Sequence, residues 1–260
     1  MATYVQERRF TPSPVFFGLV GITAAIGVVL WRGNDIRGFG VFLFVLAGWV
    51  VSLSLHEFGH AVVAYHAGDK SVADKGYLTL DVRHYADPGL SLLFPIVILL
   101  IGGIGLPGGA VWINHGAIRS PKMRSLVSAA GPAATAICAV LCLAPIRAGW
   151  VDPATHREFA VALGFLGAIQ VIALLFNLVP VPGLDGFGVI EPHLSEEMSR
   201  SLQPMRQYGI MVFIAALWFV PQVSDAFWSI TDELSRWLGG DLAAPLRSLG
   251  WFEFRFWEDL

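Results

Sequence analysis

The feature that most constrains the fold is a series of apolar segments, each about as long as a bilayer is thick. A membrane-spanning helix needs about 20 mostly apolar residues, because its backbone polar groups must be satisfied within the span. The segments that meet or approach this length are 15–31, 39–65, 126–146, 159–182 and the shorter 208–222. Only 14% of the residues are charged, against about a quarter in soluble domains. The sequence therefore predicts an all-α polytopic membrane protein with about five transmembrane helices.

Another apolar segment, residues 90–109, is interrupted by Pro95, Pro107 and three glycines between them. Its uninterrupted part is too short to cross a bilayer comfortably. Irregular backbone at membrane depth is tolerated only where protein or a water-filled cavity surrounds it. We therefore interpret 90–109 as a re-entrant segment.

Two shorter patterns predict local structure. Residues 77–82, YLTLDV, alternate polar and apolar side chains, which is typical of a strand and predicts a small β element after the second helix. Residues 224–238 predict an amphipathic helix lying on the membrane interface. Its apolar stripe would consist of Phe227, Ile230, Leu234, Trp237 and Leu238.

Charge and cysteine content exclude several classes of function. The net charge of −3 argues against a nucleic-acid partner. Cys138 and Cys142 lie four residues apart in an apolar segment, and a bridge within one helical turn has poor geometry. We expect two free thiols and no cysteine zinc site.

Ionisable residues are costly inside a bilayer, yet the second predicted span contains HEFGH, residues 56–60. On a helix, residues four apart lie on the same face, so His56 and His60 direct two imidazoles at one point, where they can bind zinc. Glu57 lies beside them and can take a proton from a zinc-activated water. This is the His-Glu-x-x-His signature of metallopeptidases. The alternative interpretation is an interfacial helix with polar residues among lipid headgroups.

A catalytic zinc usually has three protein ligands, and Asp185 is the predicted third. It lies in NLVPVPGLDGFG, at the end of the fourth span, where prolines and glycines unwind the helix. An ordinary loop aspartate beside a turn glycine is the alternative. Asn177 precedes it in the same apolar run and could donate to a developing oxyanion or hold substrate. An interhelical hydrogen bond would explain Asn177 equally well.

Three motifs together resemble the site-2 proteases, the intramembrane zinc metalloproteases. They are HEFGH, AAGPAAT (129–135) and NLVPVPGLDG (177–186). Residues 76–88 are also similar to the segment after the first motif in the compact branch of the family, which lacks PDZ and paired nucleotide-binding modules. Thr135 departs from the family pattern, which usually has asparagine at this position.

The resemblance implies a role for each motif residue. His56, His60 and Asp185 would bind one Zn²⁺ per chain, Glu57 would act as general base and acid, and Asn177 would hold substrate or the tetrahedral intermediate. Residues 1–260 would form a single membrane domain, with a catalytic core at about 40–210 and an interfacial or tail region at 223–260.

The implied activity is hydrolysis of peptide bonds within or near the transmembrane segment of a single-span membrane protein. The substrate helix must unwind first, and the strand at 77–82 would offer an edge for pairing. One alternative is a non-catalytic metal-binding scaffold or transporter that retains the motif. Another is a membrane metalloprotease with a glutamate as third ligand, for which Glu158 is the nearest candidate.

The shared zinc site also constrains topology. The HEFGH end of span 39–65 and the Asp185 end of span 159–182 must lie on one side of the membrane, so 90–109 must dip in and return. One side then carries Lys70, Lys75, Arg83, Arg119, Lys122 and Arg124 with Arg8 and Arg9, and the other carries Arg32, Arg37, Arg147 and Arg157. The positive-inside rule makes the richer side cytoplasmic. We expect a bacterial plasma-membrane protein whose active site opens toward the cytoplasm.

The remaining histidines fit no metal spacing and are expected at the surface. They are His66, His84, His115 and His193.

Overall fold

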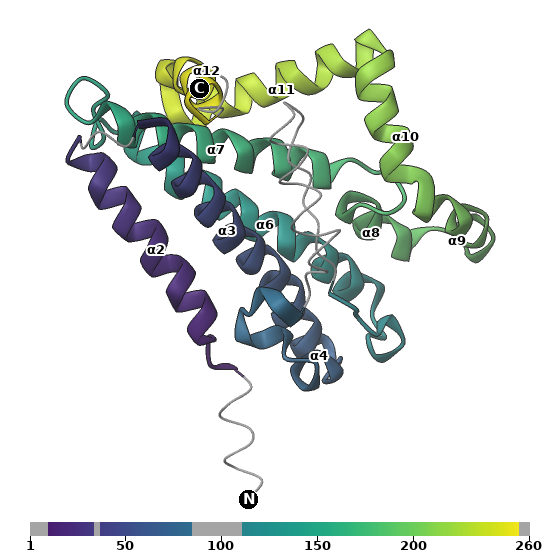
Figure 1. The fold of residues 1–260 in the computed structure, drawn as a ribbon. Coiled ribbons are helices and arrows are strands. Elements are labelled where there is room, and N and C mark those ends of the chain that lie inside the picture. Colours follow the sequence, from purple (N-terminus) through teal and green to yellow (C-terminus); the bar gives the residue numbers. More distant parts are fainter. Residues whose placement is uncertain (1–9, 34–36, 85–110, 255–260) are drawn as a thin grey trace, which may run out of the picture.

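The computed structural model describes residues 10–33, 37–84 and 111–254, and within these ranges the regular structure is helical (Figure 1). The main helices are α2 (Pro14–Trp31), α3 (Arg37–Ala67), α6 (Pro121–Arg147), α7 (Arg157–Leu178), α10 (Arg206–Phe219), α11 (Pro221–Gly239) and α12 (Ala243–Phe254). Shorter helices are α4 (Ser71–Asp74), α8 (Asp185–Ile190) and α9 (Glu196–Leu202). Single 3₁₀ turns are η2 (Tyr77–Thr79), η3 (Val82–His84), η5 (His115–Ala117), η6 (Glu191–His193), η7 (Gln203–Met205) and η8 (Gly240–Leu242).

Among the described residues, α2, α3, α6 and α7 are each long and apolar enough to cross a membrane. A fifth span is reached only if the α9–α10 and α11–α12 helices, which meet at a 95° bend, count as one. The all-α membrane fold is thus confirmed, and the expected count of about five lies at the upper limit. The predicted re-entrant segment 90–109 falls outside the described residues.

Helix α7 forms the centre of the bundle. In its most apolar stretch 78% of the residues are buried, against 11% in α2, which lies at the edge (Figure 1). Helix α7 packs against α3, α6, α11 and α12. Small residues also let α3 and α6 approach each other closely. A Cβ added to Gly59 of α3 would lie 2.6 Å from the Ala130 carbonyl oxygen of α6. This contact fixes α6 against the half of α3 that carries HEFGH.

The strand predicted for residues 77–82 is wrong. The chain forms two 3₁₀ turns, η2 and η3, and no strand occurs in the described ranges. Tyr77 and Leu78 are both buried although they are adjacent, which an alternating strand does not allow. Gly76 and Leu80 adopt left-handed conformations, with φ of 78° and 56°, and these reverse the chain. The segment packs under the end of α3, so burial rather than pairing explains its apolar residues.

The amphipathic helix predicted for 224–238 exists as α11, but its apolar stripe is divided between two environments. Phe227 and Leu238 are buried, whereas Ile230 and Trp237 are 55% and 69% exposed. Helix α11 begins at Pro221, directly after α10, and packs on α6 and α7. Figure 1 shows the sharp corner between α10 and α11. The position of this helix on a membrane interface stays a prediction.

Candidate metal centre

Helix α3 presents two imidazoles side by side. His56 and His60 lie one turn apart, and their Nε2 atoms are 3.1 Å from each other. Both residues are only 7% exposed. The helix has 31 residues, about 46 Å at 1.5 Å per residue, and the histidines lie in its C-terminal part. The helical spacing predicted from HEFGH is therefore present.

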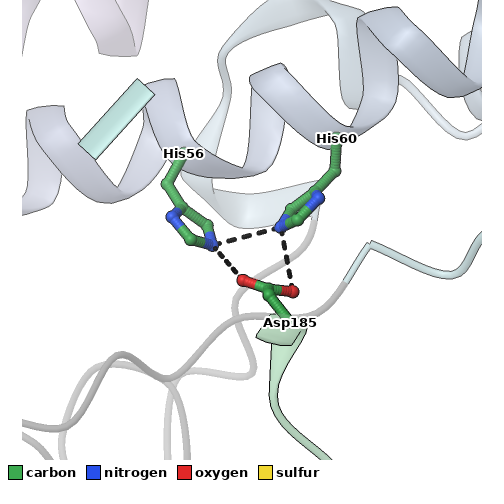
Figure 2. Close-up of side chains that lie close together, drawn as sticks. All are labelled: His56, His60 and Asp185. Carbon is green, nitrogen blue, oxygen red and sulfur yellow. Dashed lines mark hydrogen bonds and ion pairs between the residues drawn. The ribbon is translucent and has the colours of Figure 1, made fainter. Parts of the chain in front are cut away.

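Asp185 completes the cluster from the other side (Figure 2). Its carboxylate oxygens lie 3.3 Å from the Nε2 atom of His56 and 3.3 Å from that of His60. Among the described residues, these three form the group of His, Cys, Asp and Glu side chains that could hold a metal ion. The tertiary structure thus brings together the three residues that the sequence motifs predict as ligands.

The chain between α7 and α8 explains how Asp185 reaches this point. Helix α7 ends at Leu178, and Pro180 cannot donate the backbone hydrogen bond that a continuing helix needs. Gly183 has a φ of 103°, which favours glycine. A Cβ at Gly186 would lie 2.1 Å from the Leu178 carbonyl oxygen, so only glycine allows α8 to fold back against the end of α7. Asp185 is the first residue of α8 and faces the histidines.

A hydrogen bond at Nδ1 orients the imidazole ring of each histidine. Nδ1 of His60 lies 2.7 Å from the Val127 carbonyl oxygen, which can only accept, so this nitrogen carries the proton. Nδ1 of His56 lies 2.8 Å from Oγ1 of Thr135, whose hydroxyl can donate to the Gly131 carbonyl oxygen at 3.3 Å. Both Nε2 atoms therefore keep a lone pair directed toward Asp185. Such outer partners fix the tautomer and ring orientation of metal-binding histidines.

Gly131 provides the space that the two imidazoles need. A Cβ at this position would lie 2.2 Å from Nε2 of His60 and 2.6 Å from Nε2 of His56. The glycine of AAGPAAT therefore leaves the region around both Nε2 atoms open. This role could not be read from the motif, because it depends on which atoms of α3 face α6.

The three side chains fit a zinc ion. Two imidazole nitrogens and one carboxylate oxygen are a zinc donor set, and ligands about 2.0–2.1 Å from a tetrahedral zinc lie roughly 3.3 Å apart. The separations of 3.1, 3.3 and 3.3 Å match this value. Oδ2 of Asp185 is buried and has no hydrogen-bond partner among the described residues, which a metal ligand explains.

Glu57 and Asn177 line the same cavity as the three ligands, a space of about 250 Å³. Glu57 is 3% exposed, and its Oε2 accepts a hydrogen bond from the Val111 backbone nitrogen at 3.1 Å. Asn177 is 7% exposed and makes no side-chain hydrogen bond within the described ranges, so the interhelical bond considered as an alternative is not observed there. Both predicted residues thus share the cavity, while their roles stay predictions.

The non-helical segment 111–114 forms one wall of this cavity. Lys75 Nζ donates to the Trp112 carbonyl oxygen at 2.8 Å, and Oδ2 of Asp69 accepts from the Asn114 nitrogen at 2.7 Å. Val111 and Ile113 line the cavity, whereas Trp112 is 76% exposed, so alternate side chains face opposite ways as in an extended chain. Asp69 is buried and holds this wall, a role that no local sequence pattern indicates.

The other candidates lie apart from the site. Glu158, the alternative third ligand, is in the first turn of α7, at the opposite end of that helix from Asn177, and is close to Arg157. The cysteines are free, as expected. His66, His84, His115 and His193 are exposed, as predicted. His115 nevertheless lines the cavity that contains the metal ligands.

The fold and site define a membrane protein whose helices enclose a metal site of the metallopeptidase pattern. The chain is 45% identical over 235 residues to a protein of Mycolicibacterium smegmatis named "Putative zinc metalloprotease Rip2", covering 89% of this chain and 85% of that protein. A protein of the same name from Mycobacterium tuberculosis is 41% identical, over 97% of each chain. "Putative zinc metalloprotease YwhC" of Bacillus subtilis is 30% identical over 70% of this chain and 83% of its own length.

No family model and no solved structure matched the chain. On the relatives and the motifs, the chain belongs to the site-2 protease family of zinc metalloproteases. It is accordingly an integral membrane protein with Zn²⁺ as its cofactor, and the cluster of His56, His60 and Asp185 is the group that can hold the metal.

Proposed function

We propose that this protein hydrolyses peptide bonds within or near the transmembrane segment of membrane-protein substrates. The observation that carries the proposal is the position of Glu57. Its carboxylate is buried in one cavity with His56, His60 and Asp185, between helices that are long and apolar enough to span a bilayer. A metal-binding site alone gains nothing from a buried carboxylate beside its ligands, whereas hydrolysis needs a base at that place.

Each residue of the cavity has its own role in the proposed reaction. Zinc, when bound, supplies the Lewis acidity that activates water and polarises a peptide carbonyl. Glu57 takes a proton from the attacking water and returns it to the leaving amine. The Val111 N–H holds Oε2 of this glutamate, which leaves the other oxygen for proton transfer. The Asn177 amide, at the end of α7, donates to the substrate carbonyl or backbone.

The substrate would be a single-span membrane protein whose helix unwinds at the cleavage point. Because 77–82 is not a strand, it offers no edge for pairing. Segment 111–114 is the better candidate for this role. Its Trp112 carbonyl and Asn114 nitrogen are bound to Lys75 and Asp69 on one edge, while Val111 turns its N–H toward Glu57 on the other. An unwound substrate placed along that second edge would lie across the cavity.

We also propose that the active site opens toward the cytoplasm of a bacterial plasma membrane. Residues 69 and 114 are joined by a hydrogen bond, so both lie at the end of the bundle where the HEFGH part of α3 ends. Helix α6 begins at that end too, because Val127 in its second turn contacts His60. This arrangement supports an even number of crossings between α3 and α6. The excess of lysine and arginine around these helix ends favours the cytoplasmic side.

The test is Glu57→Gln in protein co-reconstituted with single-span substrates found by comparing membrane proteomes with and without active enzyme. The amide is nearly isosteric with the carboxylate, so we expect zinc content to be retained and cleavage to be lost. Glu158→Gln makes the same chemical change in α7 outside the site and should cleave normally. Wild-type cleavage by Glu57→Gln would refute the mechanism.

A non-catalytic metal-binding scaffold or transporter remains the alternative. It would need His56, His60 and Asp185 but would be indifferent to Glu57. The same pair of variants separates the two functions, because a scaffold would behave alike with Glu57→Gln and with Glu158→Gln.

A further inference from the structure

A second, larger cavity adjoins the metal cavity on its polar side. Its volume is about 700 Å³, and it is formed by the first turns of α6, by α8 and α9, and by the start of α10. The two cavities share the wall residues His115, Ser128, Gly183, Leu184 and Asp185. The two spaces are therefore adjacent, and we call the second one the polar cavity.

The polar cavity is lined by three arginines, Arg124, Arg200 and Arg206, and by three carboxylates. Arg200 and Arg206 are each paired with a glutamate that also lines it. Arg124 donates through Nε to the Ile118 carbonyl oxygen at 2.7 Å, and its terminal nitrogens have no partner in the described part of the chain. The one aspartate in the lining, Asp185, faces the metal site. Arg124 is thus a cation of the cavity wall that has no carboxylate partner in the described part of the chain.

Arg124 lies close to the junction between the two cavities, because it lines the polar cavity one helical turn before Ser128, which lines both. Partial desolvation lowers the pKa of the His115 imidazole below its ordinary value, and the positive charges of Arg124 and Arg206 lower it further. Because His115 lines both cavities, the charge of Arg124 acts where a peptide would pass from one to the other.

Helix α6 fixes the distance from Arg124 to the reaction centre. Arg124, Ser128, Gly131 and Thr135 follow a four–three–four spacing, so they share one face of the helix. Gly131 lies directly beside both metal-directed nitrogens, since a Cβ added there would lie 2.2 and 2.6 Å from them. Seven residues separate it from Arg124, which is about 10 Å along the helix axis. An extended peptide covers this distance in about three residues at 3.3 Å each.

We propose that Arg124 binds an acidic side chain of the substrate, roughly two to four residues from the scissile bond on the side that faces the polar cavity. A guanidinium binds a carboxylate through two parallel hydrogen bonds, which makes it selective for Asp and Glu over their amides. The new chain end created by cleavage is excluded as this carboxylate, because it forms at the reaction centre. The inference rests on the proposed function and adds a substrate preference to it.

The test compares substrates that differ only by Glu or Gln at one position, scanned along the residues next to the cleavage point. In neutral detergent, we expect wild-type protein to cleave the Glu form about fivefold to tenfold more efficiently at one position of the scan, as for a charge-assisted hydrogen bond in contact with water. Arg124→Gln should bring this ratio close to one, and Arg124→Lys should restore part of it. Arg124→Glu should reverse the preference toward a substrate with Lys.

Lys122→Gln is the matched control, since it removes the same charge from an exposed residue of α6 outside the cavity lining. The proposal is overturned if Lys122→Gln changes the ratio as much as Arg124→Gln, or if Arg124→Gln leaves it unchanged. It is also overturned if the preference for the Glu substrate appears only in vesicles of anionic lipid and is equal in Arg124→Gln and Lys122→Gln. The charge of the bilayer would then be its cause.

A binding measurement separates this inference from the proposed function. Labelled Glu and Gln peptides are titrated onto the Glu57→Gln protein and onto the double variant that also carries Arg124→Gln. Tighter binding of the Glu peptide only when Arg124 is present supports the acidic subsite, even if no substrate is cleaved. Equal binding of both peptides to both proteins overturns it, even if wild-type protein proves to be a protease.

Discussion

The substitution Gly131→Ala tests the metal centre without touching any ligand. The added methyl would lie 2.2 Å from Nε2 of His60 and 2.6 Å from Nε2 of His56. Ordinary contacts between such atoms are about 3.5 Å, so each imidazole must retreat by roughly 1 Å. Zinc–nitrogen bonds are about 2.0–2.1 Å and tolerate only a few tenths of an ångström.

The expected result is a large loss of zinc affinity. Removing an outer partner of a metal-binding histidine typically costs about tenfold to a hundredfold, and displacing two ligands should cost at least the upper figure, about 2.7 kcal/mol. The measurement is a competition titration with a fluorescent zinc chelator on purified protein in detergent, together with metal analysis.

Folding must be separated from metal binding, because overpacking by one methyl can itself cost about 1–3 kcal/mol. Gly18→Ala and Gly21→Ala make the same change in α2, where a Cβ meets nothing within 4 Å. Gly59→Ala strains the contact between α3 and α6 through the Ala130 carbonyl oxygen. We expect Gly59→Ala to lower thermal stability and the α2 variants to keep both stability and zinc. Full zinc affinity in Gly131→Ala would refute the assignment of this space to the metal.

Three further predictions address the ligands and the topology. Thr135→Val should weaken zinc binding by about tenfold to a hundredfold, because the His56 tautomer loses its partner, and Thr135→Ser should not; equal affinities in a chelator titration would contradict this. Asp185→Ala should lower zinc content and cleavage together, and full metal occupancy would show that another carboxylate is the third ligand. Single cysteines at positions 68, 114 and 195, in a cysteine-free background, should all be protected from an impermeant thiol reagent in intact cells. Labelling at position 114 but not at 68 would place the two residues on opposite sides and contradict the shared site.

The sequence alone predicted the parts of this protein that depend on short-range patterns. Apolar length predicted helices α2, α3, α6 and α7, because a bilayer imposes that length on any span. The spacing of His56 and His60 predicted paired imidazoles, because four residues make about one helical turn. The prolines and glycines before Asp185 predicted an unwound chain, and their backbone limits produce it in the structure.

The alternation of polar and apolar side chains in residues 77–82 predicted a strand that does not form. A strand needs a partner to receive its backbone hydrogen bonds, and local sequence cannot supply one. Tertiary packing instead buries Tyr77 and Leu78 together under the end of α3, with left-handed residues on either side of η2. The same packing, rather than any local signal, buries the Asp69 side chain and uses it to hold segment 111–114.

Only the tertiary structure decided how the metal centre is supported. The partner of His56 lies 79 residues away at Thr135, and the partner of His60 lies 67 residues away at Val127. The space at Gly131 exists because α6 crosses α3 where the histidines project. Motifs predicted the candidate ligands because the chemistry of a ligand depends on residue type and local spacing. Which atoms orient them, and which glycine leaves room, depends on contacts between helices that only folding brings together.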